Sequence, residues 1–248
     1  MSLHLAFAGE FEDALQAADA ALSIAEPQQA WSAVCLAFNG AAQVRRRQGR
    51  IEEARALLER ALALALAHDL TRQALRTYNN VADIPLQADR LSEAREVAER
   101  GHELALARGD RVWENTLALM IATAKVGLGL WDDVALDRIP VRGIQRGSVL
   151  ILQARVSAAR GQRAALEQVL AESEELDDVS NQEFAAAATV AGAIALRALG
   201  DDGAALDAAL PVAIDETVVN EDRREAYVEA GLAALALGDE ATRRPWSG

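Results

Sequence analysis

The sequence predicts an all-α protein built as a right-handed α-solenoid of antiparallel helix hairpins. Three observations support this fold class: a short phrase recurs at a fixed interval, small residues recur in step with it, and the composition is 51% hydrophobic with only 4% aromatic residues. A period of about 40 residues is typical of chains in which like units stack in a row. We expect one array over residues 1–248, with strong units over 3–135, divergent units over 136–248 and incomplete ends.

The recurring phrase marks the turn inside each hairpin. It reads GEFEDA, GRIEEA, DRLSEA and GLWDDV, and it begins at Gly9, Gly49, Asp89 and Gly129. The first residue is predicted to end one helix, because Gly adopts a left-handed cap conformation without strain. The acidic or hydroxyl residues that follow suit the start of the next helix. Weaker copies begin at Gly161, Gly200 and Gly238, at less regular spacings, so we expect seven hairpins.

Small residues form a second column with the same period. They lie seven positions before each turn, at Ser2, Ala42, Ala82, Ala122, Ala154, Ala193 and Gly231. Two helices approach closely only where a small side chain lies at their crossing. We therefore expect this column to form the contact within each helix pair.

These columns resemble the tetratricopeptide repeat in its long form. The matching residues are Phe38, Ala42, Gly49, Ile51, Ala54 and Ala61 in one unit, and Tyr78, Asn80, Ala82, Leu91 and Ala94 in the next. The chain departs from the family pattern at Asp89, Pro85 and Leu166, where a Gly, an aromatic residue and an Ala are expected. The resemblance implies a module that binds a protein or peptide ligand and performs no catalysis.

In this family the first helix of each pair lines an inner curve, where exposed residues bind extended peptides. Carried over by register, the resemblance implies a partner-binding surface of Asn39, Gln43, Arg46, Arg47, Arg76, Asn79 and Asp83. Asn39 and Asn79 occupy the same position in consecutive units, and Arg46 with Arg47 suits an acidic peptide or a phosphate. The alternative is that these residues are ordinary solvated positions on amphipathic helices.

A narrower resemblance concerns residues 77–134. They are similar to the helical-repeat regions of bacterial LuxR-type ATP-binding regulators and of nucleotide cyclases that carry an ATPase module. The resemblance implies a sensor or docking arm attached to further domains of the same polypeptide. A free-standing scaffold or assembly chaperone is the alternative, and an all-α enzyme is a third class.

Composition and charge argue against several kinds of partner. The chain has 38 acidic and 25 basic residues, a net charge of −13, which disfavours direct nucleic-acid binding and a bilayer surface. The longest uncharged apolar run, Phe184 to Leu196, has 13 residues, fewer than the roughly 20 that span a membrane. We expect this run to form a helix covered on both sides, in a cytoplasmic protein.

No set of residues predicts catalysis, a cofactor or a metal site. His4, His68 and His102 fall at different repeat positions without partners at ligand spacing, and Cys35 is expected to be a small buried residue. The segment GLGLWD at Gly127 lacks the Lys-Ser/Thr of a phosphate-binding loop. Asp132 and Asp133 are explained as a helix start, like Glu52 and Glu53.

Three further features have two interpretations each. The acidic run Glu172 to Glu183 predicts either a solvated turn or a docking site for a basic partner. Pro85 is expected to bend its helix, which either re-aims Asn79 and Asp83 or is merely tolerated. Beyond residue 115 the inner positions become largely apolar, which indicates tighter packing or an apolar groove: Leu119, Thr123, Val126, Ile151, Val190 and Ile194.

Overall fold

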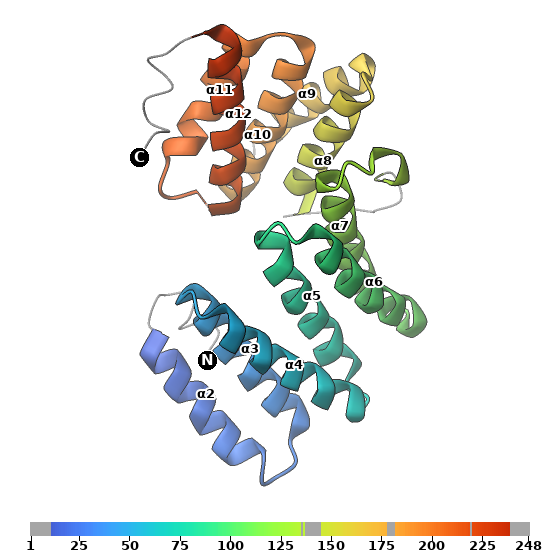
Figure 1. Cartoon of the computed structure of the whole chain (residues 1–248), viewed down its shortest axis with the longest axis vertical. Coiled ribbons are helices and arrows are strands. Elements are labelled where there is room, and N and C mark those ends of the chain that lie inside the picture. Colours follow the sequence, from blue (N-terminus) through green and yellow to red (C-terminus); the bar gives the residue numbers. More distant parts are fainter. Residues whose placement is uncertain (1–10, 135, 137–144, 178–181, 219, 239–248) are drawn as a thin grey trace. The chain divides into compact units, whose positions relative to one another are not determined.

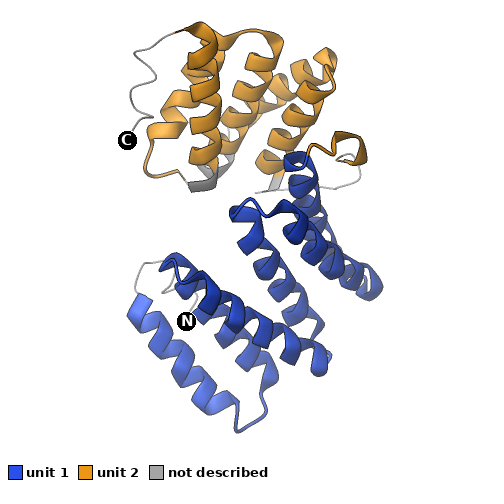
Figure 2. Ribbon diagram, in the orientation of Figure 1, with its two compact units in different colours: residues 1–128 blue, residues 129–248 orange. Residues whose placement is uncertain are grey.

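The computed structural model of the chain describes residues 11–134, 136, 145–177, 182–218 and 220–238. Within these residues there are eleven α-helices and the 3-10 helix η1, and no strand. Consecutive helices contact each other in both halves of the chain, which confirms the predicted all-α solenoid class. The chain divides into two compact units, residues 1–128 and 129–248 (Figure 2). The prediction of a single repeat array over residues 1–248 stays a prediction.

Unit 1 consists of helices joined by short turns (Figure 1). Its described helices are α2 (Phe11–Ala25), α3 (Trp31–Arg47), α4 (Ile51–Ala67), α5 (Thr71–Gln87), α6 (Leu91–Arg108) and α7 (Arg111–Gly127). The first helices of successive pairs, α3, α5 and α7, also contact one another, α3 with α5 and α5 with α7. They therefore form one continuous layer, and their surface is called the first-helix face below.

The turns of unit 1 repeat at half the period visible in the sequence. Helices α3 to α7 begin at residues 31, 51, 71, 91 and 111. Before each start, and again before η1, one residue has a left-handed backbone with φ between 52° and 74°: Gln29, Gly49, Asp69, Asp89, Gly109 and Gly129. The turns within hairpins, predicted from the recurring phrase, and the turns between hairpins thus share one geometry.

The five turns that precede α3 to α7 close the preceding helix by the same hydrogen bond. The amide N–H of Arg50 donates to the carbonyl oxygen of Arg45, and that of Arg90 to Pro85, both over 2.9 Å. This pattern, with a left-handed residue just before the donor, satisfies carbonyl groups at a helix end. Asp89 adopts the conformation of the Gly that it replaces in the phrase, so that departure from the family pattern leaves the turn intact.

The fourth copy of the phrase does not begin an α-helix. Trp131–Asp133 forms η1, and Val134 after it is extended, with φ −101° and ψ 114°. The guanidinium of Arg160 donates to the carbonyl oxygen of Trp131 and lies 3.8 Å from the carboxylate of Asp132. The prediction that Asp132 and Asp133 start a helix as Glu52 and Glu53 do is therefore corrected: they lie in a three-residue 3-10 helix, not in the first turn of an α-helix.

The column of small residues lies where the helices pack. Ala42, Ala82, Ala122, Ala154 and Ala193 are all at most 5% exposed. Ala82 belongs to a buried cluster with Tyr78 of its own helix and Val97 and Ala98 of α6. The predicted contact within helix pairs is confirmed for Ala42, Ala82, Ala154 and Ala193, which share buried clusters with the second helix of their pair. Ala122 is buried, but no second α-helix of its pair is described. Ser2 lies outside the described residues, and Gly231 is partly exposed.

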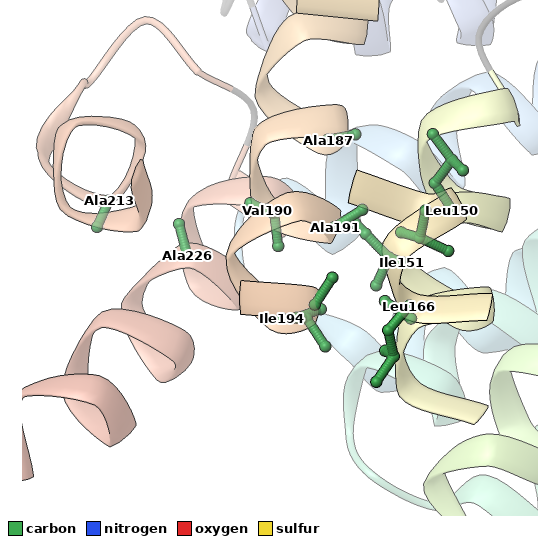
Figure 3. Close-up of a cluster of buried hydrophobic side chains, with 12 residues drawn as sticks. Leu150, Ile151, Leu166, Ala187, Val190, Ala191, Ile194, Ala213 and Ala226 are labelled. Atoms are coloured by element: carbon green, nitrogen blue, oxygen red, sulfur yellow. The ribbon is translucent and has the colours of Figure 1, made fainter. Parts of the chain in front are cut away.

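Unit 2 is built around α10. Its described elements are η1, α8 (Gln145–Ala159), α9 (Arg163–Asp177), α10 (Gln182–Leu199), α11 (Asp202–Ile214) and α12 (Asn220–Leu237). Helix α10 contacts α8, α9, α11 and α12, so the apolar run is covered on both sides as expected. Figure 3 shows Ala187 and Ala191 of α10 facing Leu150 and Ile151 of α8, in a buried cluster that also includes Val190 and Ile194. No described helix carries an apolar stretch long enough to cross a bilayer.

Two sequence predictions about this half of the chain now have an outcome. Ile151, Val190 and Ile194 are each at most 8% exposed, so these inner positions pack within unit 2 and do not form an open apolar groove. The acidic run begins on α9, which ends at Asp177, and Glu172 pairs with Arg146 over 2.5 Å. Residues 178–181, the rest of the predicted turn, lie outside the described residues.

The shared turn geometry predicts opposite effects for two substitutions. Gly49→Ala should lower the free energy of unfolding by about 1–2 kcal/mol, the cost of a left-handed residue with a Cβ. No atom lies within 4 Å of a Cβ built at Gly49, so that cost is purely conformational. Asp89→Gly should raise stability by about 0.5–1 kcal/mol. Urea unfolding followed by circular dichroism measures both, and equal midpoints for the two variants would contradict the prediction.

Candidate functional site

The first-helix face carries a buried polar contact between α3 and α5. The amide nitrogen of Asn39 donates to the hydroxyl of Thr77 and to the carbonyl oxygen of Cys35, each over 2.9 Å. Its amide oxygen accepts from the side chain of Asn80 over 2.8 Å. Asn39 is 1% exposed and Thr77 is fully buried. The buried polar groups of Asn39 and Thr77 are therefore hydrogen-bonded within the chain.

Two further polar contacts join the same helices on either side of Asn39. Toward the start of α3, the amide of Gln73 donates to the hydroxyl of Ser32 over 2.5 Å. Toward its end, the guanidinium of Arg46 pairs with the carboxylate of Asp83 over 2.5 Å, with both side chains 24% exposed. The register between α3 and α5 is thus specified by three sets of hydrogen bonds.

Because of these contacts, some residues of the predicted partner-binding surface are not available to a partner. Asn39 is not on the surface, because its amide is buried and all of its hydrogen-bonding groups are used. Arg46 and Asp83 are brought together, but as partners of each other. Gln43 and Asn79 are partly buried and Arg47 is exposed. Asn79 has one long hydrogen bond, 3.5 Å to Asn80.

A stripe of α5 completes the accessible part of this face. Arg72, Arg76, Asn79 and Asp83 follow one another at helical spacing, so they lie along one side of the helix. Arg72 is exposed and Arg76 partly so. Neither arginine forms an ion pair with a described residue. Sequence analysis identified Arg76 but missed Arg72, one helical turn away, although the spacing alone would have indicated it.

The corresponding positions of α7 are less polar. Leu119, Met120 and Thr123 take the repeat positions of Asn79, Asn80 and Asp83, and all three are partly buried. The hydroxyl of Thr123 donates to the carbonyl oxygen of Leu119 over 3.0 Å, within its own helix. At these three positions the first-helix face is therefore less polar on α7 than on α5.

A second surface lies between the second helices α4 and α6, above α5. This groove has a volume of about 420 Å³. Its floor is apolar, formed by Val81, Ile84 and Pro85 of α5. Its rims carry charges of both signs, including Arg55 and Glu93, which lie 3.8 Å apart. The mixed charge indicates no particular ligand for the groove.

Cys35 and His68, two of the side chains that could be reactive, are engaged in contacts within the fold. Burial raises the pKa of the Cys35 thiol, and the protonated sulfur donates to the carbonyl oxygen of Ala61 over 3.4 Å. His68 stacks on Trp31, with ring centroids 4.7 Å apart. Among the described residues no three His, Cys, Asp or Glu side chains converge as ligands for a metal ion.

Comparison with known proteins supports the repeat assignment in unit 1. The tetratricopeptide repeat family model matches residues 33–107, from α3 into α6. No curated protein matches the chain. Tetratricopeptide repeats generally mediate protein–protein interactions and are typically non-catalytic. The match covers α3 and α5, which carry the polar part of the first-helix face.

Asn39 and Asn79 offer a matched test of the buried polar contact. Asn39→Ala removes three hydrogen bonds and leaves the side chains of Thr77 and Asn80 without that partner, so unfolding should become easier by about 1–3 kcal/mol. Asn79→Ala, at the same repeat position, should change stability by less than about 0.5 kcal/mol. Thermal unfolding by circular dichroism compares them. Equal losses for both variants would show that the contact does not stabilise the α3–α5 register.

Proposed function

We propose that the chain is a protein-interaction module that binds an extended acidic segment of a partner along α5. The segment would lie over Arg72, Arg76 and Asn79, with Gln43 and Arg47 of α3 beside it. The observation that carries the proposal is a pair of neighbouring arginines without acidic partners among the described residues, in a chain of net charge −13. The family match over the same helices supports the choice of a protein ligand.

Arg72 and Arg76 differ from most other arginines of unit 1, which form ion pairs. Nine others form ion pairs with Asp or Glu: Arg45, Arg46, Arg50, Arg55, Arg60, Arg90, Arg95, Arg108 and Arg111. Arg72 and Arg76 share one side of α5 and would present two positive charges to the same ligand. An acidic surface otherwise repels an acidic ligand, so this stripe is where such a ligand would be held.

The spacing of the arginines suggests the pattern of the ligand. Residues four apart on a helix are separated by about 6 Å along its axis. In an extended peptide, side chains two residues apart lie on the same side and are separated by about 6.6 Å. The preferred segment would therefore carry acidic residues at positions i and i+2, and Asn79 would hydrogen-bond the peptide backbone next to them.

The wider role that we propose is a regulatory arm. On this proposal the module belongs to a cytoplasmic bacterial transcriptional or nucleotide-signalling protein, as the resemblance of residues 77–134 implies. Binding of the partner would change the packing between hairpins and so bias an attached module. A free-standing scaffold or assembly chaperone would bind a partner in the same way but would have no attached module to regulate.

A charge-reversal pair tests the binding face. The full-length protein would be titrated against fluorescent ten-residue peptides that carry Asp-X-Asp, Asp-Asp or Asn-X-Asn, with anisotropy as the readout. Arg72→Glu with Arg76→Glu should weaken binding of the Asp-X-Asp peptide at least about tenfold, because two attractive contacts become repulsive.

The control variant is Arg100→Glu. Arg100 is an exposed arginine of α6 at the rim of the groove, and it also lacks an ion pair with a described residue. It should leave affinity for the peptide unchanged. Unaltered binding by the double variant, or equal affinity for all three peptides, would contradict the proposal that an acidic segment binds along α5. Partner capture with the full-length protein and the same variants then distinguishes a regulator from a scaffold. An ATPase, cyclase or DNA-binding module on the same polypeptide indicates a regulator.

A further inference from the structure

We propose that the residue between the two acidic side chains of the ligand is apolar, and that α7 recognises it. This inference rests on the peptide-binding site proposed for α5 and specifies what the ligand carries beside its acidic residues. Helix α7 contacts α5 within the layer of first helices, so a segment bound along α5 can touch both helices. The ligand would then alternate acidic and apolar residues.

The inference begins from Val112, in the first turn of α7. Val112 is 72% exposed, more than any other large apolar side chain among the described residues. It takes the repeat position of Arg72, because α5 begins at Thr71 and α7 at Arg111. A side chain this exposed adds little to the packing of unit 1. One exposed apolar residue is ordinary by itself, so its surroundings decide what it does.

The side of α7 that carries Val112 offers a ligand mainly apolar contact. Thr116, Leu119 and Thr123 follow Val112 at helical spacing. The hydroxyl of Thr116 donates to the carbonyl oxygen of Val112 over 2.9 Å, and that of Thr123 to Leu119 over 3.0 Å. A hydroxyl has one hydrogen to donate, so both donors are used within the helix. We call these four residues the α7 stripe.

The charges at the start of α7 pair with each other. Arg111 and Glu114 form an ion pair over 2.7 Å. The opening turns of α5 instead carry Arg72 and Arg76, which form no ion pair with a described residue. A positive stripe on α5 therefore lies beside an apolar stripe on the neighbouring first helix.

An extended peptide can use both stripes at once. Its side chains alternate between two sides, and neighbours on one side are about 6.6 Å apart. Packed helices lie about 8–10 Å apart, so a peptide seated between α5 and α7 turns one set of side chains toward each helix. When the acidic residues i and i+2 face Arg72 and Arg76, residues i+1 and i+3 face the α7 stripe.

The other neighbour of α5 suits an apolar side chain less well. On α3, Leu36 is 38% exposed. The accessible positions that follow on the same side of α3 are the polar residues Gln43 and Arg47. The α7 stripe continues instead from Val112 to Leu119, two helical turns later. We therefore assign the apolar contact to α7.

The test adds three peptides to the anisotropy titration described for the proposed function. They carry Asp-Leu-Asp-Leu, Asp-Ser-Asp-Ser or Asp-Asp-Leu-Leu. The first should bind the full-length protein at least about fivefold more tightly than the second, because leucine is removed from water against α7. The third has the composition of the first without the alternation, so it should lose that gain.

Two matched variants show which helix provides the gain. Val112→Ser should abolish it and leave the affinity for Asp-Ser-Asp-Ser unchanged. The exposure of Val112 means that this substitution leaves the core intact. Leu36→Ser, on the other side of α5, is the control and should keep the gain. A gain that persists in Val112→Ser, or that is lost in Leu36→Ser, would contradict the proposal.

The outcomes separate this inference from the proposed function. If leucine adds no affinity while Arg72→Glu with Arg76→Glu still weakens binding, the acidic site on α5 stands and the apolar contact on α7 is overturned. If none of the acidic peptides binds the wild type, the proposed site and this inference are both overturned.

Discussion

Close approach of helices at small residues is the constraint on which the rest of the structure depends. Ala42, Ala82, Ala154 and Ala193 are at most 1% exposed, and each stands where one helix crosses the next. At Gly101 of α6 even one methyl group would meet Tyr78 of α5 and Leu117 of α7 within 3.1 Å. Close packing at these crossings sets α3 and α5 side by side, and the polar residues that they leave accessible give the first-helix face its character.

The regular turns bring equivalent positions of successive hairpins onto the first-helix face. Because α3, α5 and α7 begin at residues 31, 71 and 111, equivalent residues of successive hairpins return to the same place on neighbouring first helices. The chain uses that equivalence in two ways. At Asn39 the repeated position meets polar partners on α5 and fixes the register, whereas at Asn79 the side chain is partly exposed and its hydrogen bond goes to Asn80 of its own helix. One repeat position thus serves packing in one hairpin and lies partly exposed in the next.

Much of this fold could be predicted from the sequence because its signals are local. A Gly that ends a helix and an Ala at a crossing act on adjacent residues, and both recur in step. The turns between hairpins were not located because their left-handed residues, Gln29, Asp69 and Gly109, are followed by no recurring phrase. Burial of Asn39 could not be predicted, since its partners Thr77 and Asn80 lie on the first helix of the next hairpin, far away in the sequence. The phrase at Gly129 misled because it is compatible with a 3-10 turn, Trp131–Asp133, as well as with the start of an α-helix.

The substitution Gly101→Ala tests the packing constraint most directly, because two effects predict opposite signs. Helix propensity alone would stabilise the protein by about 1 kcal/mol. Close packing against Tyr78 and Leu117 should instead destabilise it by about 1–3 kcal/mol, since the backbones of three helices must separate to admit the methyl group. Urea unfolding followed by circular dichroism decides between them. We predict a lower midpoint for Gly101→Ala than for the wild type, and a raised midpoint would contradict this account of the fold.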